Sequence, residues 1–162
     1  MQDKTDKKMT IDVDVQTFVF NIDPVAKGRP RFRYVNGKSH AYTPKKTKEA
    51  TKDLSERMLL QKRYKIKKEE NNRQCAVAVY CKFYIARPKR LGLGDAVLKT
   101  TKPDVDNYVK LLLDACNEAE LWEDDSMVVE ILAQKWYCAD YESPRTMSVS
   151  YTHLTLPTIY SV

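Results

Sequence analysis

No run of apolar residues in this chain of 162 residues approaches the roughly 20 that a membrane-spanning helix needs. The first residues are polar and contain no apolar h-region, so we expect no secretory signal and a cytoplasmic protein. The four cysteines form no Cys-x-x-Cys pair and no zinc-like spacing, which indicates reduced thiols rather than a disulfide or zinc framework. The chain has no internal repeat, and its length predicts one domain with its own core.

Acidic residues are scarce in the first part of the chain and basic residues are scarce in the last. Residues 1–102 contain 25 Lys and Arg against 11 Asp and Glu, whereas residues 103–162 contain 3 against 11. A basic surface attracts a polyanion by counterion release, and a cation held by the carboxylates would offset their repulsion toward phosphate. This asymmetry favours a nucleic-acid-binding protein, although lysine-rich faces are often only solvated surface.

The hydrophobic pattern predicts an α+β fold, in which two main helices pack on a small mixed β-sheet. Residues 74–85 alternate between apolar and polar side chains, as in a half-buried strand. Asn36-Gly37 is a tight-turn signal and predicts a small hairpin, and Thr43-Pro44 is a good helix start, with Thr43 as the N-cap. We expect strands at 18–22, 74–85, 126–137 and 146–150, helices at 44–68 and 105–118, and a loop at 87–101.

The two ends of the chain differ from the middle. Residues 1–12 are interpreted as a disordered polar tail, and residues 13–150 as the folded domain. Residues 151–162 have no charged side chain and resemble the translated read-through of a sequencing adapter. We therefore interpret them as an atypical, non-native tail and assign no role to His153.

Asp104 and Asp106 lie two residues apart where a loop meets the second helix, with Lys110 one turn further on the same face. A purely structural interpretation is available for these residues. Helix capping would explain one of the two aspartates, and Lys110 would form an ordinary i,i+4 ion pair with Asp106. Together with further acids nearby, however, the pattern fits a site for a hard cation such as Mg²⁺, which prefers oxygen ligands. Lys110 would then stabilise charge that develops on a phosphate. Asp114 continues this stripe and is interpreted as structural.

A second acidic group, Trp122-Glu-Asp-Asp125, follows the helix. Because a turn and a strand come next, we expect one of these acids to return to Asp104 and Asp106. Asp125 is our choice, with Asp124 as the alternative. A solvated acidic turn is the simpler reading of the same residues.

Several of these segments resemble the RusA family of Holliday junction resolvases. The resemblance rests on Lys102-Pro-Asp-Val-Asp-Asn-Tyr-Val-Lys110, Leu113-Asp-Ala115 and Leu121-Trp-Glu-Asp-Asp125-Ser-Met-Val128, preceded by Pro24-Val-Ala-Lys-Gly-Arg-Pro-Arg31 and Ala41-Tyr-Thr-Pro-Lys45. The resemblance covers about residues 17–150, and the segments occur in the same order as in the family. One departure is Glu120, which stands where the family often has glycine.

The resemblance implies a homodimeric enzyme of phages and prophages that uses Mg²⁺ or Mn²⁺ to nick two opposing strands of a four-way junction in DNA recombination and repair. Carried over by position, the metal-binding residues are Asp104, Asp106 and Asp125, and Lys110 joins them as a catalytic residue. The implied DNA-binding residues are Lys27, Arg29, Arg31, Lys45 and Lys46.

Two other functions stay open from the sequence alone. One is a non-catalytic protein that binds DNA by its structure, and the other is a general nuclease for flaps or forks. Intact catalytic positions argue against the first. Shape recognition leaves no local motif, so the sequence does not separate the second from junction resolution. It also leaves open the cleavage sequence, the number of metal ions and the dimer interface.

Overall fold

The protein is described by a computed structural model, which covers residues 14–67 and 75–153. The main sheet contains β1 (Asp14–Phe20), β4 (Ala76–Ile85), β5 (Val97–Leu98), β6 (Val128–Tyr137) and β7 (Arg145–His153). The helices are α1 (Lys45–Gln61) and α2 (Val105–Glu118), and two short 3₁₀ turns are η1 (Lys89–Leu91) and η2 (Asp125–Met127). A separate hairpin consists of β2 (Arg31–Val35) and β3 (Lys38–Tyr42).

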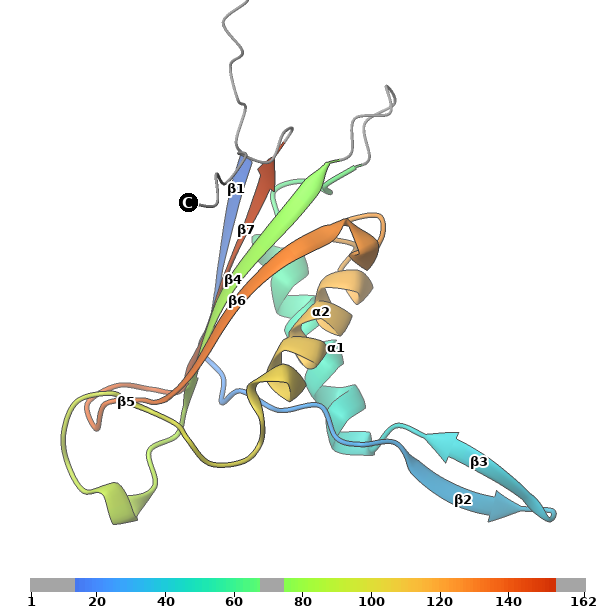
Figure 1. Ribbon diagram of the computed structural model, residues 1–162, viewed down its shortest axis with the longest axis horizontal. Helices are drawn as coiled ribbons and strands as arrows, with labels where there is room; N and C mark the ends of the chain where they lie inside the picture. Colours follow the sequence, from blue (N-terminus) through green and yellow to red (C-terminus); the bar gives the residue numbers. More distant parts are fainter. Residues whose placement is uncertain (1–13, 68–74, 154–162) are drawn as a thin grey trace, which may run out of the picture.

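The five-stranded sheet has the order β1-β7-β4-β6-β5, and both helices pack on one of its faces (Figure 1). β4 and β6 run parallel, while the other neighbouring pairs run antiparallel. The predicted α+β fold with a mixed sheet and two helices is therefore confirmed. Both helices begin at the end of the molecule from which the hairpin projects (Figure 1).

The core lies between the helices and the sheet, and the sequence pattern explains it. Val77, Val79, Cys81 and Phe83 alternate along β4 and are all buried. On α2 the predicted apolar face is buried as well, and it consists of Tyr108, Leu111, Leu112, Ala115 and Ala119. Burial raises the pKa of the Cys81 thiol to about 12, so this cysteine is a packing group and no nucleophile.

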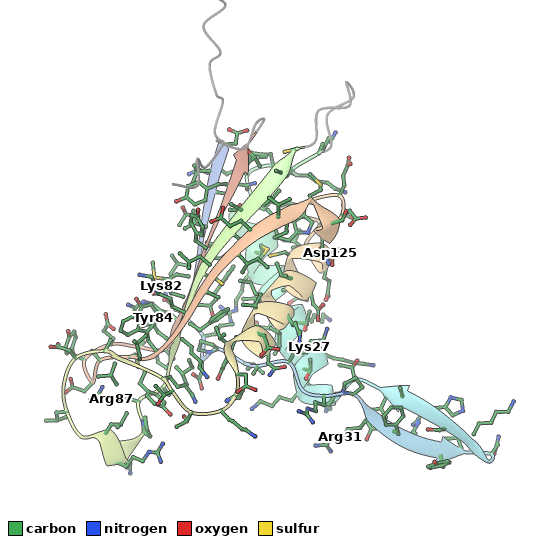
Figure 2. All side chains as sticks on the ribbon, viewed as in Figure 1. Lys27, Arg31, Lys82, Tyr84, Arg87 and Asp125 are labelled. Atoms are coloured by element: carbon green, nitrogen blue, oxygen red, sulfur yellow. The ribbon has the colours of Figure 1, made fainter. Side chains whose placement is uncertain are left out.

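The other face of the sheet has no helix on it among the described residues. On β7 the small polar side chains point toward the core, since Ser148 and Ser150 pair in register with buried β4 residues. The larger Met147 and Val149 alternate with them and share the open face with Lys82 and Tyr84 of β4, which Figure 2 labels. Apolar side chains of this face are well exposed, and they include Val15, Val19 and Leu132.

The first helix is shorter than predicted, because it ends at Gln61 rather than at residue 68. Lys62 already has an extended backbone, and the Gln16 side chain binds the chain just beyond it. The Gln16 amide donates to the Tyr64 carbonyl (3.2 Å) and accepts from the Arg63 N–H (3.1 Å). A contact from a distant strand therefore overrides the local helical pattern. At the other end, Pro44 rather than Thr43 occupies the N-cap position.

The last strand also differs from its prediction, since β7 extends to His153 instead of ending at residue 150. Thr152 pairs with both Val77 and Asp14 and is buried, so the pairing of β7 with its neighbours continues past residue 150. The predicted tail at 1–12 and residues 154–162 lie outside the described residues. The predicted loop at 87–101 contains η1 and β5. Neither described helix is long and apolar enough to cross a membrane.

Candidate active site

Asp104 stands at the N-cap of α2 but does not cap the helix with its side chain. Its backbone carbonyl accepts the Asn107 N–H (3.2 Å), while its carboxylate makes no capping hydrogen bond and is exposed. The capping explanation considered from the sequence therefore does not account for this carboxylate. The positive end of the helix dipole favours a negative group there.

Asp106 lies in the first turn of α2 and forms an ion pair with Lys110. The Lys110 Nζ donates to the Asp106 Oδ2 at 2.9 Å, and both side chains are more than half exposed. This hydrogen bond lowers the pKa of the Asp106 carboxyl below its ordinary value, so Asp106 stays ionised. The structure thus pairs Asp106 with Lys110 and places the Asp104 carboxylate at the exposed start of the same helix.

Lys27 continues the same charged stripe from a different segment. Its backbone N–H donates to the Asn107 carbonyl (2.8 Å), and its ammonium pairs with Asp114 (2.5 Å). Lys27 was expected to contact DNA, and here its charge is engaged by an α2 carboxylate. Asp114, which was interpreted from the sequence as a structural residue, has Lys27 as its ion-pair partner.

Two lysines hold the loop that leads into α2. The ammonium of Lys99, which is buried, donates to Thr101 through the carbonyl (2.8 Å) and the hydroxyl (2.7 Å), and also to the Lys102 carbonyl. Lys135 of β6 donates to the carbonyls of Thr101 (2.9 Å) and Pro103 (2.6 Å). These bonds tie the loop to the sheet and so fix the position of Asp104.

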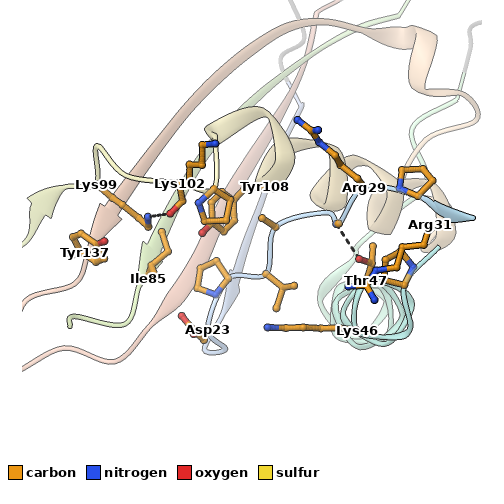
Figure 3. Close-up of a pocket in the computed structure, with 17 residues that line it drawn as sticks. Asp23, Arg29, Arg31, Lys46, Thr47, Ile85, Lys99, Lys102, Tyr108 and Tyr137 are labelled. Carbon is orange, nitrogen blue, oxygen red and sulfur yellow. Dashed lines mark hydrogen bonds between the residues drawn. The ribbon is translucent and has the colours of Figure 1, made fainter. Parts of the chain in front are cut away.

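A groove of about 740 Å³ opens beside this loop and the start of α1 (Figure 3). Its basic lining residues are Arg29, Arg31, Lys46, Lys99 and Lys102. The wall is close-packed at Gly28, whose N–H donates to the Thr47 hydroxyl (3.0 Å) and where a Cβ would lie 3.1 Å from that oxygen.

Three of the five predicted DNA contacts, Arg29, Arg31 and Lys46, therefore gather in one groove. Lys45 instead lies on the surface of α1, opposite Glu49 (3.5 Å).

Asp125 lies at the opposite end of α2 from Asp104 and Asp106 (Figure 2). It accepts a long hydrogen bond from the Asn117 amide (3.4 Å), and Asn117 in turn accepts the indole N–H of buried Trp122 (2.6 Å). A rise of about 1.5 Å per residue places Asn117 about 16 Å along the helix from Asp106. Within the described residues, no three His, Cys, Asp or Glu side chains are grouped to hold a metal ion.

Glu120, the departure noted in the sequence, has a left-handed backbone with φ of 49°. Glycine is favoured in this conformation, which ends the helix by directing the Leu121 N–H to the Cys116 carbonyl (2.9 Å). Two lysines support the turn: Lys62 donates to the Ala119 carbonyl (2.8 Å) and Lys65 pairs with Glu120 (3.2 Å). The turn that delivers Asp125 is therefore formed without glycine.

Residues 21–146 match the family of the endodeoxyribonuclease RusA. The chain belongs to the RusA family. It also resembles the uncharacterized protein YqaN of Bacillus subtilis (strain 168), with 33% identity in an alignment over 142 residues that covers 82% of this chain and 93% of the relative. RusA proteins are endodeoxyribonucleases that act on branched DNA, so the chain is placed among DNA-cutting enzymes.

Sequence reasoning missed Lys99 and Lys135, the two lysines that hold the loop of this candidate site. Lys99 directly follows β5 and Lys135 lies in β6, and no local motif marks either of them. One signal was available for Lys135, since it is one of only three basic residues in 103–162.

Proposed function

We propose that this RusA-family protein is a metal-dependent endonuclease that nicks branched DNA, with four-way junctions as its main substrate. The observation that carries the proposal is the accessible start of α2, where the non-capping Asp104 carboxylate and the Asp106–Lys110 pair adjoin a basic groove. The groove attracts the phosphate backbone, and the carboxylates suit a cation that contacts the same phosphate.

Asp104 and Asp106 would hold the cation, since both are exposed carboxylates with oxygen donors of the kind that Mg²⁺ and Mn²⁺ prefer. The bound ion would supply Lewis-acid assistance to hydrolysis of the phosphodiester. Lys110 would place its ammonium against the phosphate oxygens, where it stabilises the negative charge that develops as the bond breaks. Lys99 and Lys135 would keep the loop and Asp104 in position.

Asp125 joins this site in the proposal only through a second copy of the chain. Its hydrogen-bond partner Asn117 lies about 16 Å along α2 from Asp106, a separation too large for one ion to contact both the Asp106 and Asp125 side chains. In a symmetric dimer, Asp125 of one copy would serve the start of α2 in the other.

The direct test is cleavage of end-labelled four-way junctions, forks, flaps and linear duplex by the full-length protein, with Mg²⁺ and with EDTA. We expect paired, symmetric nicks in the junction with Mg²⁺ and none with EDTA. Tight junction binding without cutting in any metal would support a non-catalytic binding protein instead. Equal cutting of every branched substrate would support a general nuclease for flaps and forks.

A further inference from the structure

The β2–β3 hairpin is an isolated arm with two chemically different faces. It forms a sheet of its own, and every residue of both strands is exposed. Asn36 (φ 50°) and Gly37 (φ 73°) form its tight turn, with the positive angles of a type I′ turn. Figure 1 shows the arm projecting away from the sheet and helices. Since a lone two-stranded hairpin is only marginally stable in water, a binding partner would help to order it.

The strand register divides the side chains of the arm into a basic face and an aromatic face. Residues directly opposite each other in an antiparallel pair share a face. Arg31 lies opposite Tyr42, Arg33 opposite His40 and Val35 opposite Lys38, and these pairs form the basic face. Phe32 lies opposite Ala41 and Tyr34 opposite Ser39, and these pairs form the aromatic face.

The aromatic face presents two large rings with nothing over them among the described residues. Phe32 is 69% exposed and Tyr34 is 80% exposed. Their cross-strand neighbours, Ala41 and Ser39, are too small to cover them. Two residues along a strand are separated by about 6.8 Å, which is about twice the spacing of stacked bases and leaves room for one base between the rings.

Charge identifies the partner of the arm as a polyanion. No acidic residue occurs between Asp23 and Glu49, whereas this stretch contains eight Lys and Arg. The basic face also joins the groove beside the active site, because Arg31 belongs to both. DNA offers phosphates to the basic face and base rings to the aromatic face, and aromatic side chains stack on bases of any sequence.

We propose that Phe32 and Tyr34 stack on bases exposed where a DNA duplex is interrupted, and that this contact makes the protein prefer branched DNA to continuous duplex. In a continuous duplex both faces of each base pair are covered by neighbours, whereas a branch point interrupts the stack. The proposal rests on the proposed function, since it assigns the choice of substrate to the hairpin and leaves the cutting to the start of α2.

The first test measures binding of the full-length protein in EDTA, where no cutting is expected, to a four-way junction and to a duplex of equal length. Phe32→Ala/Tyr34→Ala should weaken junction binding at least about tenfold, because each lost stacking contact has an effect of this order. Duplex binding should change less than about twofold. The matched control is Tyr141→Ala, which removes another exposed ring, 76% exposed, in the β6–β7 turn and should leave both affinities unchanged.

A second pair of variants separates stacking from general apolar contact. Phe32→Leu/Tyr34→Leu keeps apolar bulk without rings and should lose the junction preference, whereas Phe32→Trp/Tyr34→Trp should keep it. On the DNA side, abasic sites at the branch point should weaken wild-type binding but add no further loss to the alanine variant. Arg33→Ala should weaken junction and duplex binding equally and reduce their salt dependence.

The proposal is overturned if the alanine variant keeps wild-type preference for the junction, or if the leucine variant binds junctions as the wild type does. It is also overturned if the alanine variant changes the oligomeric state by light scattering while DNA binding is unchanged, since the face would then contact protein. A wild-type protein that prefers junctions through Phe32 and Tyr34 but never cuts them would contradict the proposed nuclease and leave this inference standing.

Discussion

Aspartates of one predicted site lie near both ends of α2, and their surroundings differ. At the start, Asp104 and Asp106 are exposed and next to a basic groove, and the hydrogen bond from Lys110 keeps Asp106 ionised. At the far end, Asp125 lies beside Asn117 and the buried Trp122 indole, on a turn fixed by the left-handed Glu120. The start is arranged to receive a ligand, and the far end is arranged to hold one carboxylate in place. Their separation is the basis for the proposal that one chain supplies parts of two different sites in a dimer.

Removing a carboxylate at the start of α2 should have the largest effect. Asp106→Asn keeps the side-chain shape but loses the charge for the cation and the partner of Lys110. We expect junction cleavage to fall about 100- to 1,000-fold, with DNA binding kept or tightened because repulsion of phosphate is removed. Gel assays of cleavage and binding measure both. Asp53→Asn, in an exposed ion pair on α1, is the matched control. Cleavage at the wild-type rate would remove Asp106 from the site.

Removing the hydrogen bond between Trp122 and Asn117 at the C-terminal end of α2 should mainly lower the stability of the protein. Asn117→Ala leaves the indole N–H of buried Trp122 without its acceptor, which should lower the free energy of unfolding by about 2 kcal/mol. Urea unfolding followed by tryptophan fluorescence measures this loss. Trp122→Phe in the Asn117→Ala background removes the unpaired N–H, so it should cost less there than in the wild type. A stability unchanged by Asn117→Ala would show that this end is not held as described.

Variants of the residues that hold the loop before α2 can displace Asp104 without removing a carboxylate. Lys135→Met removes two hydrogen bonds to the loop carbonyls and should lower cleavage about tenfold through misplacement of Asp104. Single-turnover rates at saturating DNA report this effect separately from binding. Lys82→Met, on the open face of the sheet, is the control. An equal loss in both variants would attribute the effect to charge alone.

A smaller effect is expected at the turn that follows α2. Glu120→Gly relieves the cost of a left-handed backbone in a residue with a Cβ, and it should raise the free energy of unfolding by about 1 kcal/mol. Glu120→Ala loses the same ion pair with Lys65 but keeps the Cβ, so it should not be stabilising. Thermal unfolding compares the two variants. If glycine is no more stable than alanine, the backbone at Glu120 is not strained.

The smallest effect concerns the titration of Asp106. The hydrogen bond from Lys110 lowers the pKa of Asp106, so the pair's contribution to stability is complete above the ordinary pKa and is lost as the pH falls through the lowered pKa. Lys110→Met should raise the Asp106 pKa back toward its ordinary value. Carbon-detected NMR of the carboxyl group measures the change between about pH 2 and 6. An unchanged midpoint would mean that the two side chains do not interact in solution.

The strongly patterned parts of the fold were predictable from the sequence. Helix 105–118 was placed at its observed bounds, and the Asn36-Gly37 turn identified the hairpin because that turn type demands those residues. The length of α1 was not predictable, because Gln16, far away in sequence, binds the chain where the helix stops. Lys135 was not predictable for the same reason, because the loop carbonyls that it contacts lie 34 and 32 residues away in sequence. The sequence placed Asp125 near Asp104 on the basis of a helix, a turn and a strand, and this order does not specify which end of the helix the chain returns to.

The most direct test of the account is complementation between two inactive variants, Asp104→Asn and Asp125→Asn, co-expressed with different tags and purified as mixed dimers. If Asp125 of one copy serves the start of α2 in the other, one of the two sites in each mixed dimer has all its carboxylates. Mixed dimers should therefore nick a labelled four-way junction with Mg²⁺, whereas each variant alone should not. Mixed dimers as inactive as the separate variants would contradict it, because both aspartates would then act within one chain.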